Sequence, residues 1–184
     1  MTGGKAQGFG VAGIVLHWTV ALGIVGMIAF GMTIGAMESG PEKTRLIQVH
    51  KSFGILVGAL ALARLILRVR EGFPEPAGAV APWEAALARQ THIALLTLTV
   101  VMPLSGMLKS VTYARAVDVF GIPLLPQLLS EKHVAANEVA SWVHATCGWL
   151  LALLLALHVL GALKHHVVDR DATLRRMLRP VPDR

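Results

Sequence analysis

Three long stretches of this 184-residue chain, 6–37, 90–108 and 139–163, contain no Asp, Glu, Lys or Arg. About 20 apolar residues are enough for a helix to cross the hydrocarbon core of a bilayer. The composition agrees, because 54% of the residues are hydrophobic and 15% are charged, against about 45–50% and about 25% in soluble domains. These features exclude a soluble globular enzyme, a disordered protein and a disulfide scaffold, and they predict an integral membrane protein.

Apolar segments and the turn signals between them predict four membrane-spanning helices, at about 11–37, 46–69, 83–110 and 137–164. A Pro/Gly-rich linker, 72–82, and a longer connection, 111–133, lie between the later spans. We therefore expect an all-α transmembrane four-helix bundle that forms one domain over residues 1–184. The first apolar run is too long for a signal peptide, so we expect it to be retained. The sequence shows no convincing internal repeat.

The basic residues are distributed unevenly between the two sides of these spans. The N-terminus, the 64–89 connection and the tail from Lys164 hold 11 lysines and arginines, whereas the 38–51 and 109–138 connections hold 6. Positively charged loops stay in the cytoplasm, which predicts cytoplasmic termini and, in a bacterium, a multi-pass protein of the inner membrane. This topology also explains the net charge of +6. Because the chain has no nucleic-acid motif, we expect no nucleic-acid partner.

Four of the eight histidines fall inside the predicted spans at two matched depths. His17 and His158 each lie about 9 Å from a cytoplasmic end, at about 1.5 Å per helical residue. His50 and His144 each lie about 8–9 Å from an outer end. Ionisable residues inside a membrane are costly and usually functional, although a single histidine can simply bond to a neighbouring helix. Two pairs, one near each surface, favour a functional interpretation.

The spacing along the fourth span indicates stacked cofactors. His144 and His158 are 14 residues apart, so they share one helix face at a separation of about 21 Å. Haem iron takes axial ligands from opposite sides, and two imidazoles leave no open position, which favours electron transfer. Zinc prefers four clustered ligands, and a histidine proton relay would not require matched levels. Pairing alone leaves His92 as a competitor of His17 for partnership with His158.

Arginines in the second span offer counter-charges for haem propionates. Arg64 lies 14 residues after His50, on the same helix face and near the inner tier. Arginine forms strong paired hydrogen bonds to carboxylates, so we assign Arg64, with Arg68 as a second candidate, to the inner propionates. Lys51 is the outer counterpart. His165 and His166, at the cytoplasmic boundary, are interfacial residues or bind a quinone carbonyl or a haem carboxylate.

Taken together, several motifs resemble the bacterial cytochrome b561 family over nearly the whole chain. They are His17-Trp18, the HKSFG segment at 50–54, Arg64-Leu65, the PLSG segment at 103–106, Phe120-Gly121, His144, His158 and the tail LKHHVVDRDATLRRMLRP. The resemblance implies two b-type haems ligated by His17, His50, His144 and His158, and thereby decides against His92. It also implies a superoxide oxidase that passes electrons from periplasmic superoxide to ubiquinone, with His165 at the quinone end.

The predicted function is therefore transmembrane electron transfer through two haems b, with lipid, superoxide and ubiquinone as partners. We take Lys51 and His165 as candidate catalytic residues at the superoxide and quinone ends. The basic residues of the outer connections exceed the acidic ones by a formal +1, so attraction of an anion depends on their local arrangement. Two alternatives stay open: an electron-transfer subunit between quinol and a periplasmic redox protein, and a haem-free transporter or proton relay based on histidine.

Overall fold

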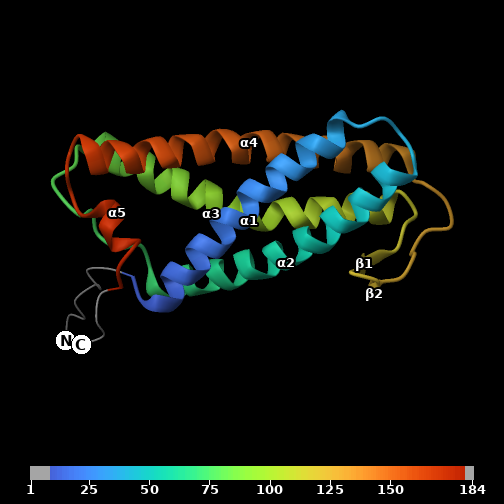
Figure 1. Ribbon diagram of the computed structural model, residues 1–184, viewed down its shortest axis with the longest axis horizontal. Coiled ribbons are helices and arrows are strands. Elements are labelled where there is room, and N and C mark those ends of the chain that lie inside the picture. Colours follow the sequence, from blue (N-terminus) through green and yellow to red (C-terminus); the bar gives the residue numbers. More distant parts are fainter. Residues whose placement is uncertain (1–8, 181–184) are drawn as a thin grey trace.

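The structure, a computed structural model, describes residues 9–180 and contains four long helices (Figure 1). Lys5 and Arg184, which enter the predicted charge count, lie outside the described residues. The elements are α1 (Val11–Ala36), α2 (Pro41–Glu71), α3 (Pro82–Thr112), β1 (Val117–Val119), β2 (Ile122–Leu125), α4 (Val134–Val167) and α5 (Thr173–Arg176). The predicted all-α membrane bundle is thus confirmed, with a small hairpin added to it.

All four long helices have the length and hydropathy of membrane spans. The shortest, α1, has 26 residues and is about 39 Å long, which exceeds the roughly 30 Å of a bilayer core. Large apolar side chains stand exposed on the outside of the bundle, among them Leu22, Trp142 and Leu160, each more than 60% exposed. In water such a surface would be unstable, so we place it against lipid.

Local residue chemistry explains where the helices begin and end. Prolines occupy the first positions of α2 and α3, where the missing N–H costs nothing. Gly72, with φ +73°, ends α2 in a conformation that favours glycine. Both helices extend beyond the predicted spans 46–69 and 83–110, because polar turns continue each helix past its apolar centre. Pro103 lies inside α3, and membrane helices tolerate this.

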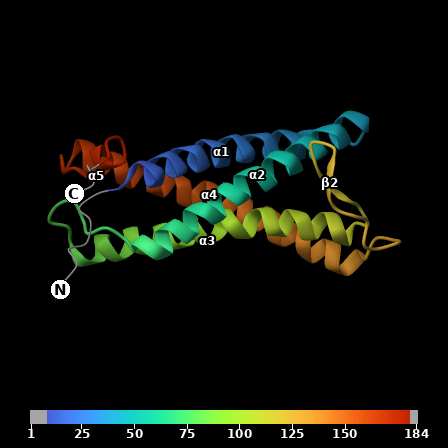
Figure 2. The same cartoon turned by 90° about the horizontal axis from the view of Figure 1, so that it is seen from below.

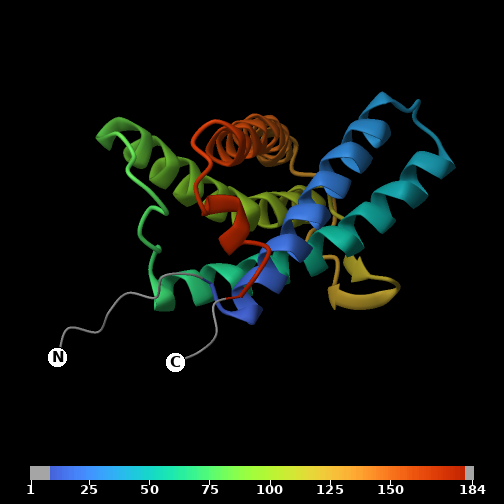
Figure 3. The ribbon, with the colours of Figure 1, turned by 60° about the vertical axis from the view of Figure 1, so that its left-hand side comes forward.

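The four helices form two hairpins, α1 with α2 and α3 with α4, which are joined mainly by contact between α2 and α3 (Figures 2 and 3). That contact is close: a Cβ atom built on Gly58 of α2 would lie 2.6 Å from Cγ of Pro103 in α3. Val20, Ile24 and Ala61 form a buried apolar cluster between α1 and α2. It occupies the middle of the bundle and separates the two predicted histidine levels.

Different structures cover the two ends of the bundle. At one end, β1 and β2 form an antiparallel hairpin in the connection between α3 and α4, and Phe120 and Gly121 at its turn both have positive φ (Figure 1). At the other end, α5 lies near the start of α1 (Figure 1), and the Trp18 indole N–H donates a hydrogen bond of 2.7 Å to the Met177 carbonyl. The sequence had indicated only a connection at 111–133, because such short strands carry little pattern.

Candidate functional site

Five histidines from all four long helices gather at two levels of the bundle. At the level near the β-hairpin, named the outer level after the predicted topology, the ring centres of His50 in α2 and His144 in α4 are 6.5 Å apart. At the inner level, near α5, the ring centres of His17 in α1 and His158 in α4 are 6.1 Å apart. His92 of α3 also lies at the inner level, with its ring centre 5.1 Å from that of His158. The two predicted pairs are therefore adjacent in space.

These separations can be compared with the geometry of two imidazoles on one metal ion. A bond from a metal to an imidazole nitrogen is about 2.0–2.1 Å, and a ring centre lies about 1.1 Å beyond that nitrogen, so two opposed rings have centres about 6.2–6.4 Å apart. The pairs His50–His144 and His17–His158, at 6.5 and 6.1 Å, agree with this separation. The pair His92–His158 is about 1 Å too close. By ring-centre separation, the two predicted pairs are compatible with two bis-imidazole metal centres, and the pair His92–His158 is not.

The outer pair is closely surrounded by small and apolar groups. A Cβ atom on Gly106 would lie 3.1 Å from Cε1 of His144, and one on Gly31 would lie 3.2 Å from Cε1 of His50. Nδ1 of His144 is 3.0 Å from the Ser105 hydroxyl, whereas Nδ1 of His50 is buried without a hydrogen-bond partner among the described residues. An unpartnered buried nitrogen is costly, and the two outer histidines therefore have different surroundings.

Arg64 and Arg68 lie at the inner level, as predicted, but each bonds to another group of the protein. The Arg64 guanidinium is 3.0 Å from Nδ1 of His17, and Arg68 donates a 2.8 Å hydrogen bond to the Gly72 carbonyl. Because arginine can only donate, Nδ1 of His17 must accept, which places the ring proton on Nε2. A metal bound through Nε2 would therefore require Arg64 to move to another acceptor, as the predicted propionate role supposes.

Lys51 connects α2 to the outer hairpin. Its ammonium donates to the Ala116 carbonyl at 3.2 Å, and the neighbouring Ser52 hydroxyl accepts a 2.9 Å hydrogen bond from the Phe120 amide. A cavity of about 210 Å³ lies beside this contact, lined by Gln48, Val49, Ser52, Asp118, Phe120 and Gly121. Lys51 therefore holds the hairpin near the outer level, and Asp118 of the cavity has the same charge sign as superoxide.

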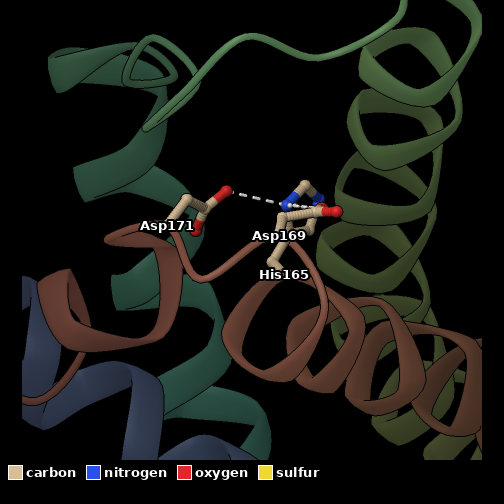
Figure 4. A group of neighbouring side chains, drawn as sticks. All are labelled: His165, Asp169 and Asp171. Carbon is tan, nitrogen blue, oxygen red and sulfur yellow. Dashed lines mark hydrogen bonds and ion pairs between the residues drawn. The ribbon is translucent and has the colours of Figure 1, made fainter.

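His165 lies in the last turn of α4 and interacts with two carboxylates of the C-terminal segment (Figure 4). Its Nδ1 is 2.8 Å from Asp171 and 3.0 Å from Asp169. Burial raises the pKa of Asp171, but hydrogen bonds from Thr173 and His165 outweigh it and hold that pKa below its usual value. Lys164 also pairs with Asp169 at 2.9 Å. The group is thus an ion-pair network that fixes the direction of the His165 ring.

Sequence reasoning did not identify three polar residues that now contact the predicted histidines. Asp169 and Asp171 follow His165 by four and six residues, a spacing that could have suggested the ion pairs. Ser105 lies in a charge-free span directly before Gly106. A hydroxyl group among apolar residues was the only feature of the sequence that could have indicated a polar contact there. Its partner on another helix could not be identified from the sequence alone.

Comparisons with known proteins agree with these observations. Residues 8–180 match the family model described as prokaryotic cytochrome b561. The chain is 32% identical to cytochrome b561 homolog 2 of Escherichia coli, over 92% of this chain and 90% of that protein. It is 26% identical to cytochrome b561 homolog 1 of the same organism, over 90% and 93%. It is also 25% identical to a probable superoxide oxidase, CybB, of Yersinia pestis, over 90% and 92%.

Proposed function

The chain belongs to the prokaryotic cytochrome b561 family, and from this premise we propose that it carries single electrons from superoxide to ubiquinone through two haems. Membership makes it a multi-pass protein of the bacterial inner membrane that binds haem b and transfers electrons. A haem-free transporter is therefore set aside. The number of haems, their ligands and the two substrates are the new parts of the proposal.

The observation that carries the proposal is the spacing of two imidazole pairs at two levels. His50 and His144 would hold the outer haem, and His17 and His158 the inner one, since only these ring separations suit two axial ligands. Haem with two histidine ligands supplies a one-electron carrier without an open coordination position. Arg64, which is half-buried beside His17, would then turn to a propionate, because a buried guanidinium favours a carboxylate partner.

The inner end is suited to proton transfer at a quinone. Asp171 accepts the hydrogen bond of Nδ1 of His165 and Asp169 lies 3.0 Å from the same nitrogen, so these carboxylates direct the Nε2 of His165 away from them. In the overall reaction, two superoxide anions lose one electron each and become dioxygen. One ubiquinone takes up those two electrons and two protons and becomes ubiquinol. His165 would donate the proton at the quinone oxygen, with Asp171 as its positioning partner.

The outer end would receive superoxide on the periplasmic side, and both termini would lie in the cytoplasm. Basic residues concentrate on the side of α5, as the distribution of charge in membrane proteins requires. Lys51 is the basic residue that connects α2 to the hairpin at the outer level. A fixed positive charge beside an electron-accepting centre favours approach of a small anion.

Purified protein tests the proposal directly. We expect two haems b per chain, with low-spin bis-histidine spectra, and reduction of a soluble ubiquinone when an enzymatic source supplies superoxide. Lys51→Gln should lower the rate at low ionic strength and have less effect at high salt, whereas Lys43→Gln serves as a control on the same helix. Two haems without superoxide-dependent quinone reduction would refute the choice of substrate and leave the haem assignment intact.

A second candidate keeps the haems but changes the electron partner at the outer end to a periplasmic redox protein. The hairpin favours this candidate, because Phe120 and Ile122 expose 55% and 72% of their surface there. Exposed apolar patches frequently mark protein interaction sites. Replacement of both residues by serine would abolish electron exchange with such a protein and would not change the reaction with superoxide.

A further inference from the structure

The contacts of the outer level show a repeat that the sequence did not reveal. In the first hairpin, Met27 and Gly31 lie one turn apart on α1 and face Gly54 and His50, one turn apart on α2. A Cβ atom on Gly31 would lie 3.2 Å from Cε1 of His50, and one on Gly54 would lie 3.4 Å from the Met27 methyl group. Each helix thus has a small residue where its neighbour has a large one.

The second hairpin contains the same arrangement. Met102 and Gly106 lie one turn apart on α3 and face Gly148 and His144 on α4. A Cβ atom on Gly106 would lie 3.1 Å from Cε1 of His144, and one on Gly148 would lie 3.3 Å from the Met102 methyl group. Adding 75 to the numbers of the methionine and glycine of α1 gives those of α3. Adding 94 to the numbers of the histidine and glycine of α2 gives those of α4.

The same two offsets extend to the inner level. An offset of 75 residues relates His17 of α1 to His92 of α3, and an offset of 94 relates Arg64 of α2 to His158 of α4. Within each hairpin these counterparts lie together: Arg64 is 3.0 Å from the His17 nitrogen, and the His92 and His158 ring centres are 5.1 Å apart. The two hairpins therefore share one pattern of counterpart residues and contacts at both levels.

One departure from the repeat falls beside the outer histidines. The offset of 75 residues places Phe30 of α1 where α3 has Ser105. The Ser105 hydroxyl is 3.0 Å from Nδ1 of His144. The Phe30 ring lies beside His50, with ring centres 5.6 Å apart, and Nδ1 of His50 is buried without a partner in the described part of the chain. Two equivalent histidines thus differ in one hydrogen bond.

The proton positions at His144 follow from the bonds of Ser105. The serine hydroxyl has one proton and donates it to the Met102 carbonyl at 2.7 Å. Its oxygen must then accept the proton of Nδ1 of His144. This leaves Nε2 of His144 unprotonated and available to a metal ion. His50 has no such constraint, because a phenyl ring occupies the equivalent place.

We propose that Ser105 is a positioning residue for His144 and that Phe30 withholds the same hydrogen bond from His50, so that the outer haem has two unequal axial ligands. The inference rests on the proposed ligation of that haem. A hydrogen bond from Nδ1–H makes an imidazole a stronger donor to its metal. Stronger donation stabilises ferric iron and so lowers the reduction potential. With this hydrogen bond on His144 but not on His50, the outer haem would have a higher reduction potential than a haem with the bond on both ligands. A higher potential suits a centre that must take electrons from an external donor.

Redox titration of the purified holoprotein tests this inference. Loss of one supporting group changes metal affinity by about 10–100-fold. If this loss falls on ferric iron, the ferric-to-ferrous preference changes by the same factor, which corresponds to about 59–118 mV at about 59 mV per tenfold. Ser105→Ala should raise the outer-haem potential by about this amount and alter its electron paramagnetic resonance g-values, and Ser105→Thr should restore both. Phe30→Ser should lower the potential relative to Phe30→Ala, which opens the same space without an acceptor. The inner-haem potential should stay constant throughout.

The outcomes separate this inference from the proposed function. An unchanged outer potential in Ser105→Ala, with two bis-histidine haems still bound, overturns the inference and leaves the proposed function standing. Equal potentials for Phe30→Ser and Phe30→Ala overturn the role given to Phe30. A parent protein without bis-histidine spectra overturns the proposed ligation, and the role of Ser105 with it. Selective loss of the outer haem in Ser105→Ala, restored by threonine, supports the positioning role.

Discussion

A single methyl group at Gly106 should weaken the outer haem site without harming the helix that carries it. The Cβ atom of Gly106→Ala would lie 3.1 Å from Cε1 and 3.4 Å from Nδ1 of His144. Ordinary carbon contacts are about 3.5–4.0 Å, so the ring must retreat by about 0.4 Å or more. The Ser105 hydrogen bond opposes this retreat. Metal–ligand distances tolerate about 0.2 Å, and the required shift exceeds that tolerance.

The expected magnitude is a loss of about 10–100-fold in affinity for the outer haem, as for other disturbed ligand supports, or about 1.4–2.8 kcal/mol. The helix itself should gain, since alanine is favoured over glycine in a helix interior by about 1 kcal/mol. The measurement is the rate of haem transfer from purified protein to an excess of a haem-binding apoprotein. It is followed together with the haem-to-protein ratio and the thermal unfolding of the apoprotein.

Two other glycines are matched controls. Gly26→Ala adds a methyl group with nothing within 4 Å, so both haems should be retained. Gly148→Ala meets the Met102 methyl group at 3.3 Å, and this flexible side chain can move aside, so a loss smaller than that of Gly106→Ala is expected. If Gly106→Ala and Gly26→Ala release the outer haem at the same rate, the argument from ring displacement is wrong.

Three further predictions concern the histidines and the inner end. His144→Ala should lose only the outer haem and His17→Ala only the inner one, by pyridine haemochrome and electron paramagnetic resonance; retention of both haems in either variant contradicts the ligand assignment. His92→Leu should keep two haems, because its ring is too close to His158 to share a metal with it, and loss of the inner haem would instead make it a ligand. Because the pKa of Asp171 lies below its ordinary 3.8, its carboxylate stabilises the folded protein above that pH, and this contribution disappears as the pH falls through the folded-state pKa. Asp171→Asn should therefore unfold at a lower temperature than the parent at about pH 7, and this difference should shrink as the pH falls below 3.8 and through the folded-state pKa; a difference that does not depend on pH would refute this role.

The parts of the molecule that could be predicted from the sequence depend on one helix at a time. Charge-free runs indicate the membrane spans, and a rise of about 1.5 Å per residue gives the depth of each histidine. The positions of His144 and His158 on one face of α4 follow from the same geometry. The depth of each histidine in the membrane thus follows from its own helix without any contact between helices, and it predicts which histidines lie at the same level.

The remaining features depend on contacts between helices, which the sequence does not determine. The ring centre of His92 lies 5.1 Å from that of His158, whereas the ring centre of His17 lies 6.1 Å from it. The depth of each histidine along its helix does not predict which of the two is closer. The bond between Ser105 and His144 joins residues 39 positions apart. The repeat was missed because its two copies share a few contact residues at fixed offsets, whereas the lipid-facing residues between them vary freely within an apolar class.

The repeat relates the two hairpins at the same level, so what it does not supply at either end of the bundle comes from the segments added there. The α1–α2 connection is short, 37–40, whereas the corresponding α3–α4 connection adds the β-hairpin that Lys51 binds at the outer end. The C-terminal segment adds Asp169 and Asp171 beside His165 at the inner end. Under the proposed function, the hairpin would serve as the contact surface for the electron donor, and the His165 imidazole, held by its carboxylates, would serve the quinone. Exchange of these two additions should impair quinone reduction while leaving both haem sites assembled, because all the rings at the two levels belong to the four long helices.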